Sequence, residues 1–499
     1  MLGTPATEDA AGGSWSGARK LVLCVIDGVA PQMLERAVEE ERAPAIARFI
    51  EDGVYVDDCV SAFPSITPVC AATIATGTAQ DQHLIPNMNW YHRGEARYVE
   101  YGSSFAASRT FGIHRSLLDT IYNMNLAHLS PDVQTVFESL DDADVRTAGT
   151  TFLIYRGRHR HEIARETPIT GLLNRTLFRH GVWGPRELFY ADVFASRRTG
   201  CRSQLGLPGV RDQHTGCVGS YLVEHDLFDF LLFSLPDNDT HSHKTGPEGQ
   251  IESIAGADRE LQRLADAAGG MDAFLEAHAI IVMGDHSQVL IEDRISLGEA
   301  FAAWKVRRPV GPEDGAEIAV CPAQRSAGLY VIDEERRDEL LPELVGTALE
   351  TPGVDLVLSH DDGEAVITSA QGELRFAPDG PLADVRGGTW SVRGDFAVLE
   401  LQSAHGGVWS DEYPDALARA WAAVTCPTSG DLLLSAAPGY EFTDWGGADH
   451  VGGGSHGSLH RSDSQGVLLW CGTGPDRREA RPQWTLRDVA PMVRQHFGL

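Results

Sequence analysis

The sequence predicts an α/β fold built around a mostly parallel sheet. Three runs, Leu21–Ile26, Leu231–Leu235 and Ala279–Gly284, are continuously apolar rather than alternating. Such runs are typical of strands that are buried on both faces of a parallel sheet. Each run leads into carboxylate or histidine residues, and in open α/β sheets ligands bind at the edge where the strands end. At 499 residues the chain exceeds the size at which a single core stops growing, so we expect one large domain with inserted segments.

The first apolar run ends in Asp27-Gly28. A carboxylate followed by glycine at the carboxyl edge of a sheet suits a bound cation. An ordinary turn after a strand has the same two residues, so the metal-ligand interpretation depends on the remaining motifs.

The second motif is the segment Phe63–Gly77, in which Pro68 suits the first turn of a helix. This places Thr67 at the N-cap of that helix. A neighbouring metal ion and the positive end of the helix would both favour the Thr67 alkoxide, which makes Thr67 a candidate nucleophile. The alternative is that Thr67 only caps the helix.

The second apolar run leads into a polar segment that is rich in aspartate and histidine. An aspartate and a histidine four residues apart on a turn can reach the same ion. Two pairs have this spacing, Asp237 with His241 and Asp239 with His243. The spacing alone does not choose between them.

The last two motifs repeat this pattern. Asp285-His286 follows the third apolar run, and His456 lies within the glycine-rich segment 452–457. Glycines on both sides of a histidine allow the backbone to approach a ligand closely. Residue types that bind metals therefore recur at every one of these chain positions, which indicates a shared metal centre.

On these motifs the chain resembles the nucleotide pyrophosphatase/phosphodiesterase (type I phosphodiesterase) family of the alkaline phosphatase superfamily, over residues 20–290 and 430–499. Thr67 is followed by Gly77 at the family spacing, and Asp239 and His243 are followed by Gly246-Pro247. The resemblance selects Asp239 and His243 over the other pair. It also implies an alkaline-phosphatase-like α/β/α sandwich with a mostly parallel central sheet and inserted cap segments.

The resemblance further implies two ligand sets and a mechanism. One divalent ion would be held by Asp239, His243 and His456, and the second by Asp27, Asp285 and His286 with Thr67 touching it. Zinc is the expected ion, with manganese or iron as alternatives, because mixed aspartate and histidine sites accept all three. Thr67 would attack phosphorus in a phosphodiester or pyrophosphate to form a phosphothreonine, which water would then release.

One departure from the family concerns the contacts to the substrate. The family has an asparagine after the nucleophile, and none lies between Thr67 and His83. Cys70 is the nearest side chain one helical turn on, although a thiol donates poorly, and Asn87, Asn89 or an arginine are alternatives.

A basic patch lies further along the chain and comprises Arg156, Arg158, His159, Arg160, His161 and Arg165. We expect Arg158 and Arg160 to receive the anionic part of the substrate. The alternative is a solvated charged loop.

Composition narrows the partners of the protein. The formal net charge of −30 argues against binding to nucleic-acid polymers or anionic membranes, so a small phosphate ester is the expected partner. No run of 18 apolar residues occurs. The eight cysteines are far apart and lack CxxC spacing, which favours reduced thiols and, together with the absence of a signal-peptide pattern, a cytoplasmic location. The sequence does not indicate an oligomeric state.

The motifs also predict how the chain is divided. Residues 1–19 form a flexible tail, and residues 20–299 form a catalytic α/β domain with an insertion at 156–224. Residues 300–430 form a small β-rich cap, and residues 431–499 return to the catalytic domain. Helices are expected at 132–140 and from 411 to 424.

Other classes of protein fit less well. A sulfatase needs Cys-x-Pro-x-Arg at the nucleophile, whereas Cys321–Arg325 has a different spacing and lies far from Thr67 in the sequence. A phosphonate hydrolase similar to phosphonoacetate hydrolases, or a phosphomonoesterase of the same superfamily, is the alternative enzyme. A noncatalytic metal-binding protein would be favoured if a ligand or Thr67 were missing, and none is.

Overall fold

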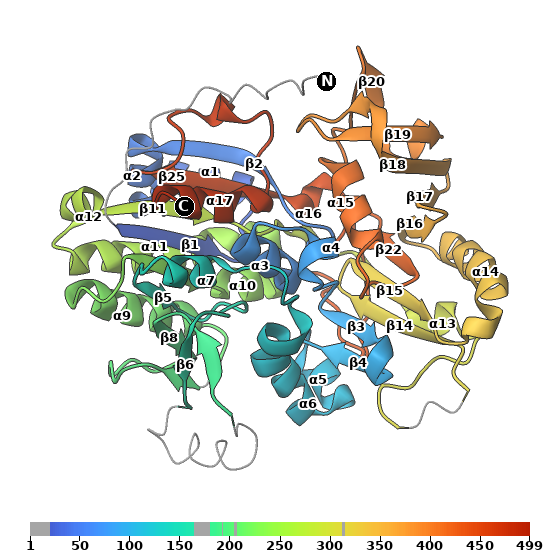
Figure 1. Cartoon of the computed structure of the whole chain (residues 1–499), viewed down its shortest axis with the longest axis horizontal. Helices are drawn as coiled ribbons and strands as arrows, with labels where there is room; N and C mark the ends of the chain where they lie inside the picture. The colour runs from blue at the N-terminus through green and yellow to red at the C-terminus, as the bar shows by residue number, and fades with distance from the viewer. Residues whose placement is uncertain (1–19, 164–179, 192, 204–206, 312–314) are drawn as a thin grey trace, which may run out of the picture.

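The computed structural model describes residues 20–163, 180–191, 193–203, 207–311 and 315–499, so the predicted tail at 1–19 and Arg165 of the basic patch lie outside the described residues. An eight-stranded sheet forms the centre of one half of the molecule (Figure 1). Its strands, in spatial order, are β2 (Val54–Val60), β25 (Gln465–Cys471), β11 (His278–Met283), β1 (Lys20–Ile26), β10 (Phe230–Leu235), β5 (Thr147–Gly149), β8 (Glu187–Tyr190) and β9 (Phe194–Ala195).

Most neighbouring strands in this sheet are parallel. β1 pairs in parallel with both β10 and β11, and β5 pairs in parallel with β10 and β8. The strand β25 runs antiparallel to β11 and β2, and β9 runs antiparallel to β8. All residues of β10 and β11 are buried, as are Leu21–Ile26 of β1. The predicted α/β class with a mostly parallel sheet is therefore confirmed.

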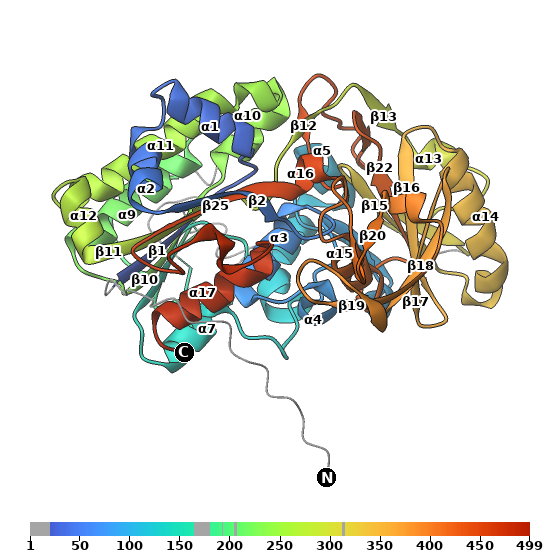
Figure 2. The same ribbon diagram turned by 90° about the horizontal axis from the view of Figure 1, so that it is seen from above.

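Helices cover both faces of this sheet (Figure 2). On one face lie α1 (Pro31–Glu39), α2 (Pro44–Asp52), α9 (Arg211–Glu224), α11 (Gln250–Ala267) and α12 (Met271–Ala277), and on the other lie α3 (Thr67–Thr76), α7 (Val136–Asp142) and α17 (Val489–His496). Because side chains alternate along a strand, β1 contributes to two cores. Val22, Cys24 and Ile26 pack in one core, whereas Leu21, Leu23 and Val25 pack in the other.

A second, mainly antiparallel sheet lies beside the first (Figure 1). Its strands are β14 (Ile318–Ala323), β15 (Ser326–Val331), β22 (Leu432–Ala436), β16 (Val354–Asp361), β17 (Glu364–Ser369), β18 (Gly372–Ala383), β21 (Gly407–Trp409) and β20 (Gln402–Ala404), with β19 (Thr389–Gly394) paired to β18. The helices α14 (Arg337–Glu350) and α15 (Ala416–Val424) pack in two different cores of this sheet. The strand β22 lies in this sheet although it follows residue 430.

Smaller elements connect these parts. They are α4 (Gln80–His83), β3 (Asn89–His92), β4 (Arg97–Glu100), α5 (Phe105–Phe111), α6 (Ile113–Leu118), β6 (His159–His161), β7 (Val182–Gly184), α10 (Asp237–Thr245), β12 (Val289–Leu290), β13 (Asp293–Ile295), α13 (Leu297–Ala300), β23 (Tyr440–Phe442), β24 (Gly454–Ser455) and α16 (Arg461–Ser464). Among the described residues, no helix combines the length and the apolar character needed to cross a membrane.

Two local expectations need correction. The helix α3 begins at Thr67, and Ile66 rather than Thr67 stands at its N-cap, without a side-chain cap. The Thr67 hydroxyl is therefore not used to cap the helix. By contrast, Thr135 caps α7 through a reciprocal capping box with Glu138, which explains why that helix starts later than predicted.

The expectation that all eight cysteines are reduced is wrong for two of them. Cys201 and Cys217 form a disulfide with their Cα atoms 5.8 Å apart, and the other six cysteines are free and buried. The two cysteines are 16 residues apart in the sequence, and that separation is not a recognisable disulfide signal. The cytoplasmic location remains a prediction.

Candidate metal centre

The motif residues converge at one edge of the central sheet. Asp27 follows β1, α10 follows β10, and Asp285-His286 follows β11. These three strands are parallel neighbours, so their carboxyl ends lie together. His456 follows β24, which pairs with β12, the short strand that comes after Asp285-His286 in the chain. Thr67 is the first residue of α3.

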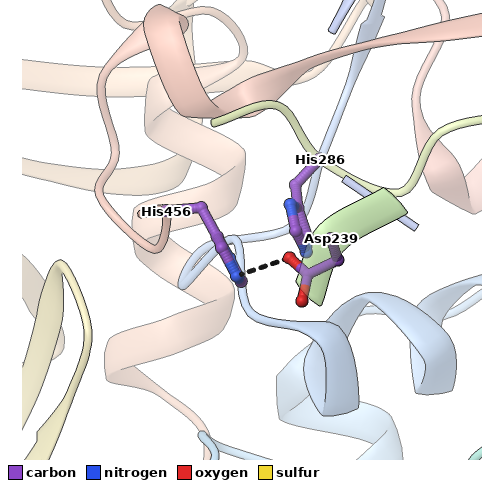
Figure 3. Close-up of side chains that lie close together, drawn as sticks. All are labelled: Asp239, His286 and His456. Atoms are coloured by element: carbon purple, nitrogen blue, oxygen red, sulfur yellow. Dashed lines mark ion pairs between the residues drawn. The ribbon is translucent and has the colours of Figure 1, made fainter. Parts of the chain in front are cut away.

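Asp239, His286 and His456 form the first group of side chains with metal-ligand geometry, and they point toward one another (Figure 3). Asp239 Oδ1 lies 3.4 Å from His456 Nε2, and Asp239 Oδ2 lies 3.2 Å from His243 Nε2. The rings of His286 and His456 stack with centroids 3.6 Å apart. His243, which the family spacing paired with Asp239, is not one of these three residues, but it adjoins the group through Asp239.

Asp27, Asp285 and His286 form the second group. His286 Nε2 lies 3.4 Å from Asp27 Oδ1 and 3.6 Å from Asp285 Oδ2. The Thr67 hydroxyl lies 3.4 Å from the same nitrogen. His286 thus adjoins both groups, whereas the resemblance assigned it only to the second.

Backbone carbonyls orient three of the histidines. Nδ1 of His243 lies 2.7 Å from the Gly454 carbonyl, Nδ1 of His456 lies 2.7 Å from the Ser65 carbonyl, and Nδ1 of His286 lies 3.1 Å from the Ser287 carbonyl. A carbonyl can only accept, so in each ring Nδ1 carries a proton, and Nε2, which faces the carboxylates, is the nitrogen available to a metal ion when the ring is neutral. This is the tautomer in which histidine binds a metal ion.

The three carboxylates strongly affect one another. Burial and the neighbouring Asp285 and Asp239 raise the pKa of Asp27 well above its ordinary value. Burial also raises the pKa of Asp285 to about 6. Burial opposes ionisation of Asp239 as well, but His243 and His456 hold its pKa well below the usual range. Ionisation of Asp27 and Asp285 is therefore unfavourable in the cluster by itself, and a bound cation would favour it.

Unsatisfied atoms in the cluster fit bound divalent cations. Asp27 Oδ1 and His456 Nε2 are buried without a hydrogen-bond partner. A buried polar atom without a partner is rare in proteins unless it binds water or an ion. Carboxylate oxygens and imidazole nitrogens are donors that zinc, manganese and iron accept. The residues present thus suit two neighbouring divalent ions.

Amide side chains that spacing did not single out hold the acidic residues in place. Asn238 donates to the Asp27 carbonyl at 2.8 Å, and Gln288 donates to Asp239 Oδ1 at 2.6 Å. Gly28 donates its N–H to Asp285 Oδ1 at 3.0 Å and has a φ of +68°. The one feature of the sequence that points to Asn238 and Gln288 is that they lie within the metal motifs.

A further histidine extends the stacked rings. The rings of His450 and His243 lie 4.1 Å apart, and those of His243 and His456 lie 5.3 Å apart. Nδ1 of His450 lies 3.0 Å from the buried carboxylate of Glu441. His450 lies in the same glycine-rich region as His456, which is the one feature of the sequence that points to it.

Several candidates lie apart from the cluster. Asp237 accepts hydrogen bonds from Arg211 and Gly209, away from Asp239. Cys70 has no exposed surface, contacts Ser61, and burial raises its thiol pKa well above the ordinary value. A buried thiol in this position offers no surface to a substrate in the described conformation.

Arg158 of the basic patch lies at the opposite edge of the sheet. Arg158 bonds Asp142 and Glu138, and its N–H donates to Asp141, which also accepts from Thr147 at the start of β5. Because the metal motifs lie where the parallel strands end, a residue tied to the start of β5 faces away from them. Arg160 is exposed and pairs with Glu162. Asn89 is occupied within the β3–β4 hairpin by the Val99 carbonyl and Glu100.

Together, the three-layer fold and this acidic and histidine-rich edge define a hydrolase of the alkaline phosphatase superfamily. The family model for type I phosphodiesterase / nucleotide pyrophosphatase matches residues 21–459, and the chain belongs to that family. Its members are metal-dependent hydrolases of phosphoric esters, so the chain is a hydrolase of the phosphodiesterase/pyrophosphatase or phosphonate-hydrolase kind. A comparison with curated proteins finds no match.

Solved structures share this fold. Murine ectonucleotide pyrophosphatase/phosphodiesterase 5, solved as an inactive threonine-to-alanine variant in complex with AMP, superposes with a TM-score of 0.57 at 12% identity, covering 96% of this chain and 95% of that one. The human form gives 0.56 at 12% identity, with coverage of 95% and 94%. Phosphonoacetate hydrolase from Sinorhizobium meliloti, in complex with phosphonoformate, gives 0.50 at 16% identity, covering 99% and 100%.

Proposed function

We propose that this protein is a phosphodiesterase or pyrophosphatase in which Thr67 is the nucleophile and two divalent ions occupy the acidic and histidine-rich edge. The observation that carries the proposal is the position of the Thr67 hydroxyl. It stands at the start of α3, 3.4 Å from His286 Nε2, where both ligand groups meet. No capping bond occupies it, so the hydroxyl remains available for attack.

The two proposed ligand sets are those that the resemblance implies. Asp239, His243 and His456 would hold one ion, and Asp27, Asp285 and His286 would hold the other. Bound divalent ions supply Lewis-acid stabilisation of phosphoryl oxygens and lower the pKa of a coordinated hydroxyl or water. Zinc fits this donor set, as do manganese and iron.

The remaining chemistry belongs to the side chains of the protein. Thr67 loses its proton to solvent and its Oγ1 forms a bond to phosphorus while the bond to the leaving oxygen breaks. The N-terminus of helix α3 favours negative charge on Thr67 Oγ1, because the first N–H groups of the helix lack partners within it. Water then attacks the phosphothreonine from the side that the leaving group vacated, and this second displacement restores Thr67.

The proposal is tested by comparing esters with the same chromophore. We expect the metal-loaded protein to cleave bis(p-nitrophenyl) phosphate faster than p-nitrophenyl phosphate. Thr67→Ala should reduce turnover by at least about 10³-fold, because it removes the nucleophile, while elemental analysis still finds about two ions per chain. The matched control is Thr76→Ala at the other end of α3, whose hydroxyl bonds only within its own region.

The other outcomes distinguish the alternatives. Faster cleavage of the monoester would indicate a phosphomonoesterase, and selective cleavage of p-nitrophenyl phenylphosphonate would indicate activity on phosphonates. Unchanged turnover in Thr67→Ala would refute the role of Thr67. A loss of bound metal in that variant would show that the hydroxyl is needed for metal binding, and turnover alone would then not identify the nucleophile.

A further inference from the structure

We infer that Gln324, which no metal motif contains, donates a hydrogen bond to the oxygen of the leaving group during phosphodiester cleavage. The inference rests on the proposed function and assigns a catalytic contact to the second sheet. Gln324 is 257 residues from Thr67 in the sequence and lies in the turn between β14 and β15.

The backbone at Gln324 is unusual for a residue with a side chain. Ala323 pairs with Ser326, so Gln324 and Arg325 form a two-residue hairpin loop. Gln324 has a φ of +57°, a left-handed conformation that favours glycine. Strained residues of this kind cluster at functional sites, where the surrounding structure holds them in place.

The neighbours of Gln324 fix this turn against the metal centre. The Arg325 N–H donates to the carbonyl of His456 at 3.0 Å, and the Arg325 guanidinium lies 2.9 Å from the carboxylate of Asp463, with both side chains fully buried. The Gln324 carbonyl accepts from the Phe442 N–H at 2.7 Å. The hairpin loop is therefore held at a fixed position beside one of the candidate ligands.

The side chain of Gln324 reaches into the centre. Its Nε2 lies 3.4 Å from His243 Nε2, the nitrogen that faces Asp239. Its Oε1 is buried without a hydrogen-bond partner. The amide nitrogen carries two N–H groups, so one remains to donate to a bound oxygen when the other faces His243.

Thr67 and Gln324 contact histidines of different proposed ligand sets, so they adjoin different ends of the pair of proposed ion sites. Thr67 contacts His286, His286 stacks on His456, His456 lies beside His243, and His243 contacts Gln324. In an in-line displacement the attacking and leaving oxygens stand on opposite sides of phosphorus. If Thr67 attacks from its end, the leaving oxygen departs toward Gln324.

The proposed step balances without a further reactant. The bond from Thr67 Oγ1 to phosphorus forms as the bond from phosphorus to the leaving oxygen breaks, and the electron pair stays on that oxygen. The Gln324 N–H donates to this developing charge and keeps its proton, and solvent later protonates the released oxyanion to give the alcohol. A donor aimed at developing charge contributes more in the transition state than in the ground state.

The test varies the leaving group and the side chain together. Gln324→Gly removes the amide and also relieves the left-handed backbone, so a loss of activity does not reflect a strained fold. Gln324→Asn keeps an amide that is one methylene shorter. The matched control is Asp362→Gly, which alters another left-handed residue, φ +47°, in the β16–β17 hairpin loop of the same sheet.

The probes are methyl phosphodiesters with p-nitrophenoxide or phenoxide as the leaving group. Phenoxide carries a more localised charge, so Gln324→Gly should lower kcat about 100-fold for phenoxide and only about tenfold for p-nitrophenoxide. Gln324→Asn should show the same difference to a smaller extent. Binding of inorganic phosphate, which has no leaving group, should stay within about twofold by calorimetry, and metal content should be unchanged.

Equal losses for both leaving groups, or no loss, would overturn the role of Gln324. Weakened phosphate binding would also overturn it, because the amide would then contact the transferred phosphoryl group or support the ligands. Absence of diester cleavage by the unaltered protein is a separate result, which would refute the proposed function itself.

Discussion

Replacing Asp285 with asparagine should change the stability of this protein in opposite directions with and without metal. Asp285 is buried beside Asp27 and Asp239, and burial raises its pKa from 3.8 to about 6. The folded state therefore binds a proton more tightly than the unfolded state. This penalty is absent below pH 3.8, grows as the pH rises toward 6, and is complete above the folded pKa.

The magnitude follows from that difference in pKa. At about 1.4 kcal/mol for each tenfold change, the charge on Asp285 destabilises the metal-free fold by about 3 kcal/mol near pH 7. An unfolding entropy of about 2.1 cal/mol/K per residue gives about 1 kcal/mol per kelvin for 499 residues. Asp285→Asn should therefore raise the melting temperature of the metal-free protein by about 3 °C at pH 7, and by progressively less toward pH 4.

The asparagine also suits the local hydrogen bonds of the metal-free site. Its oxygen can keep the bond from the Gly28 N–H, and its NH₂ group can face the Nε2 lone pair of His286, now 3.6 Å from Asp285 Oδ2. In the metal-loaded protein the same change removes an anionic ligand. We therefore expect the metal-loaded variant to melt at a lower temperature than the metal-loaded parent, because weaker metal binding adds less to the stability of the folded state.

The assay is scanning calorimetry at pH 4 to 8 after dialysis against chelator, repeated after reloading with zinc. Asp476→Asn, an exposed aspartate outside the cluster, serves as the control and should shift neither melting temperature. A metal-free Asp285→Asn protein that melts at or below its metal-free parent near pH 7 would refute the electrostatic reasoning.

Three further predictions test other parts of the structure. Gly28→Ala should weaken metal binding, because a Cβ there would lie 3.1 Å from Gln288 Nε2 and 3.2 Å from Asp239 Oδ1. Competition with a chromogenic chelator measures this binding. The control is Gly102→Ala, which should leave metal binding unchanged, because Gly102 also has a positive φ but has open space around it. Thiol titration of the denatured, unreduced protein should find six free thiols of eight, and eight would contradict the Cys201–Cys217 bond. Arg158→Ala should leave kcat/KM for a small diester within about twofold, since that side chain is tied to the far edge of the sheet, whereas a tenfold loss would place it at the substrate.

The strands and their polar ends could be read from the sequence because both depend on local chemistry. A continuously apolar run is typical of a strand buried on both faces, and parallel neighbouring strands end at the same edge of a sheet. Patterns within short segments were therefore enough to predict that Asp27, Asp239 and Asp285 lie close together. The choice of Asp239 over Asp237 needed the family spacing, and the packing of α10 agrees with it, since Asp237 turns toward Arg211.

Other features depend on contacts between distant segments, which no local pattern records. Arg158 of the basic patch was expected to receive the anionic part of the substrate, but its partners Asp141 and Asp142 hold it at the opposite edge. The Cys201–Cys217 bond joins a residue outside α9 to one within that helix. Gln324 reaches His243 only because the second sheet packs its β14–β15 turn against the glycine-rich segment that carries His456. Local chemistry thus determined which residue types end each strand, whereas the packing of one sheet against the other decided which side chains complete the site.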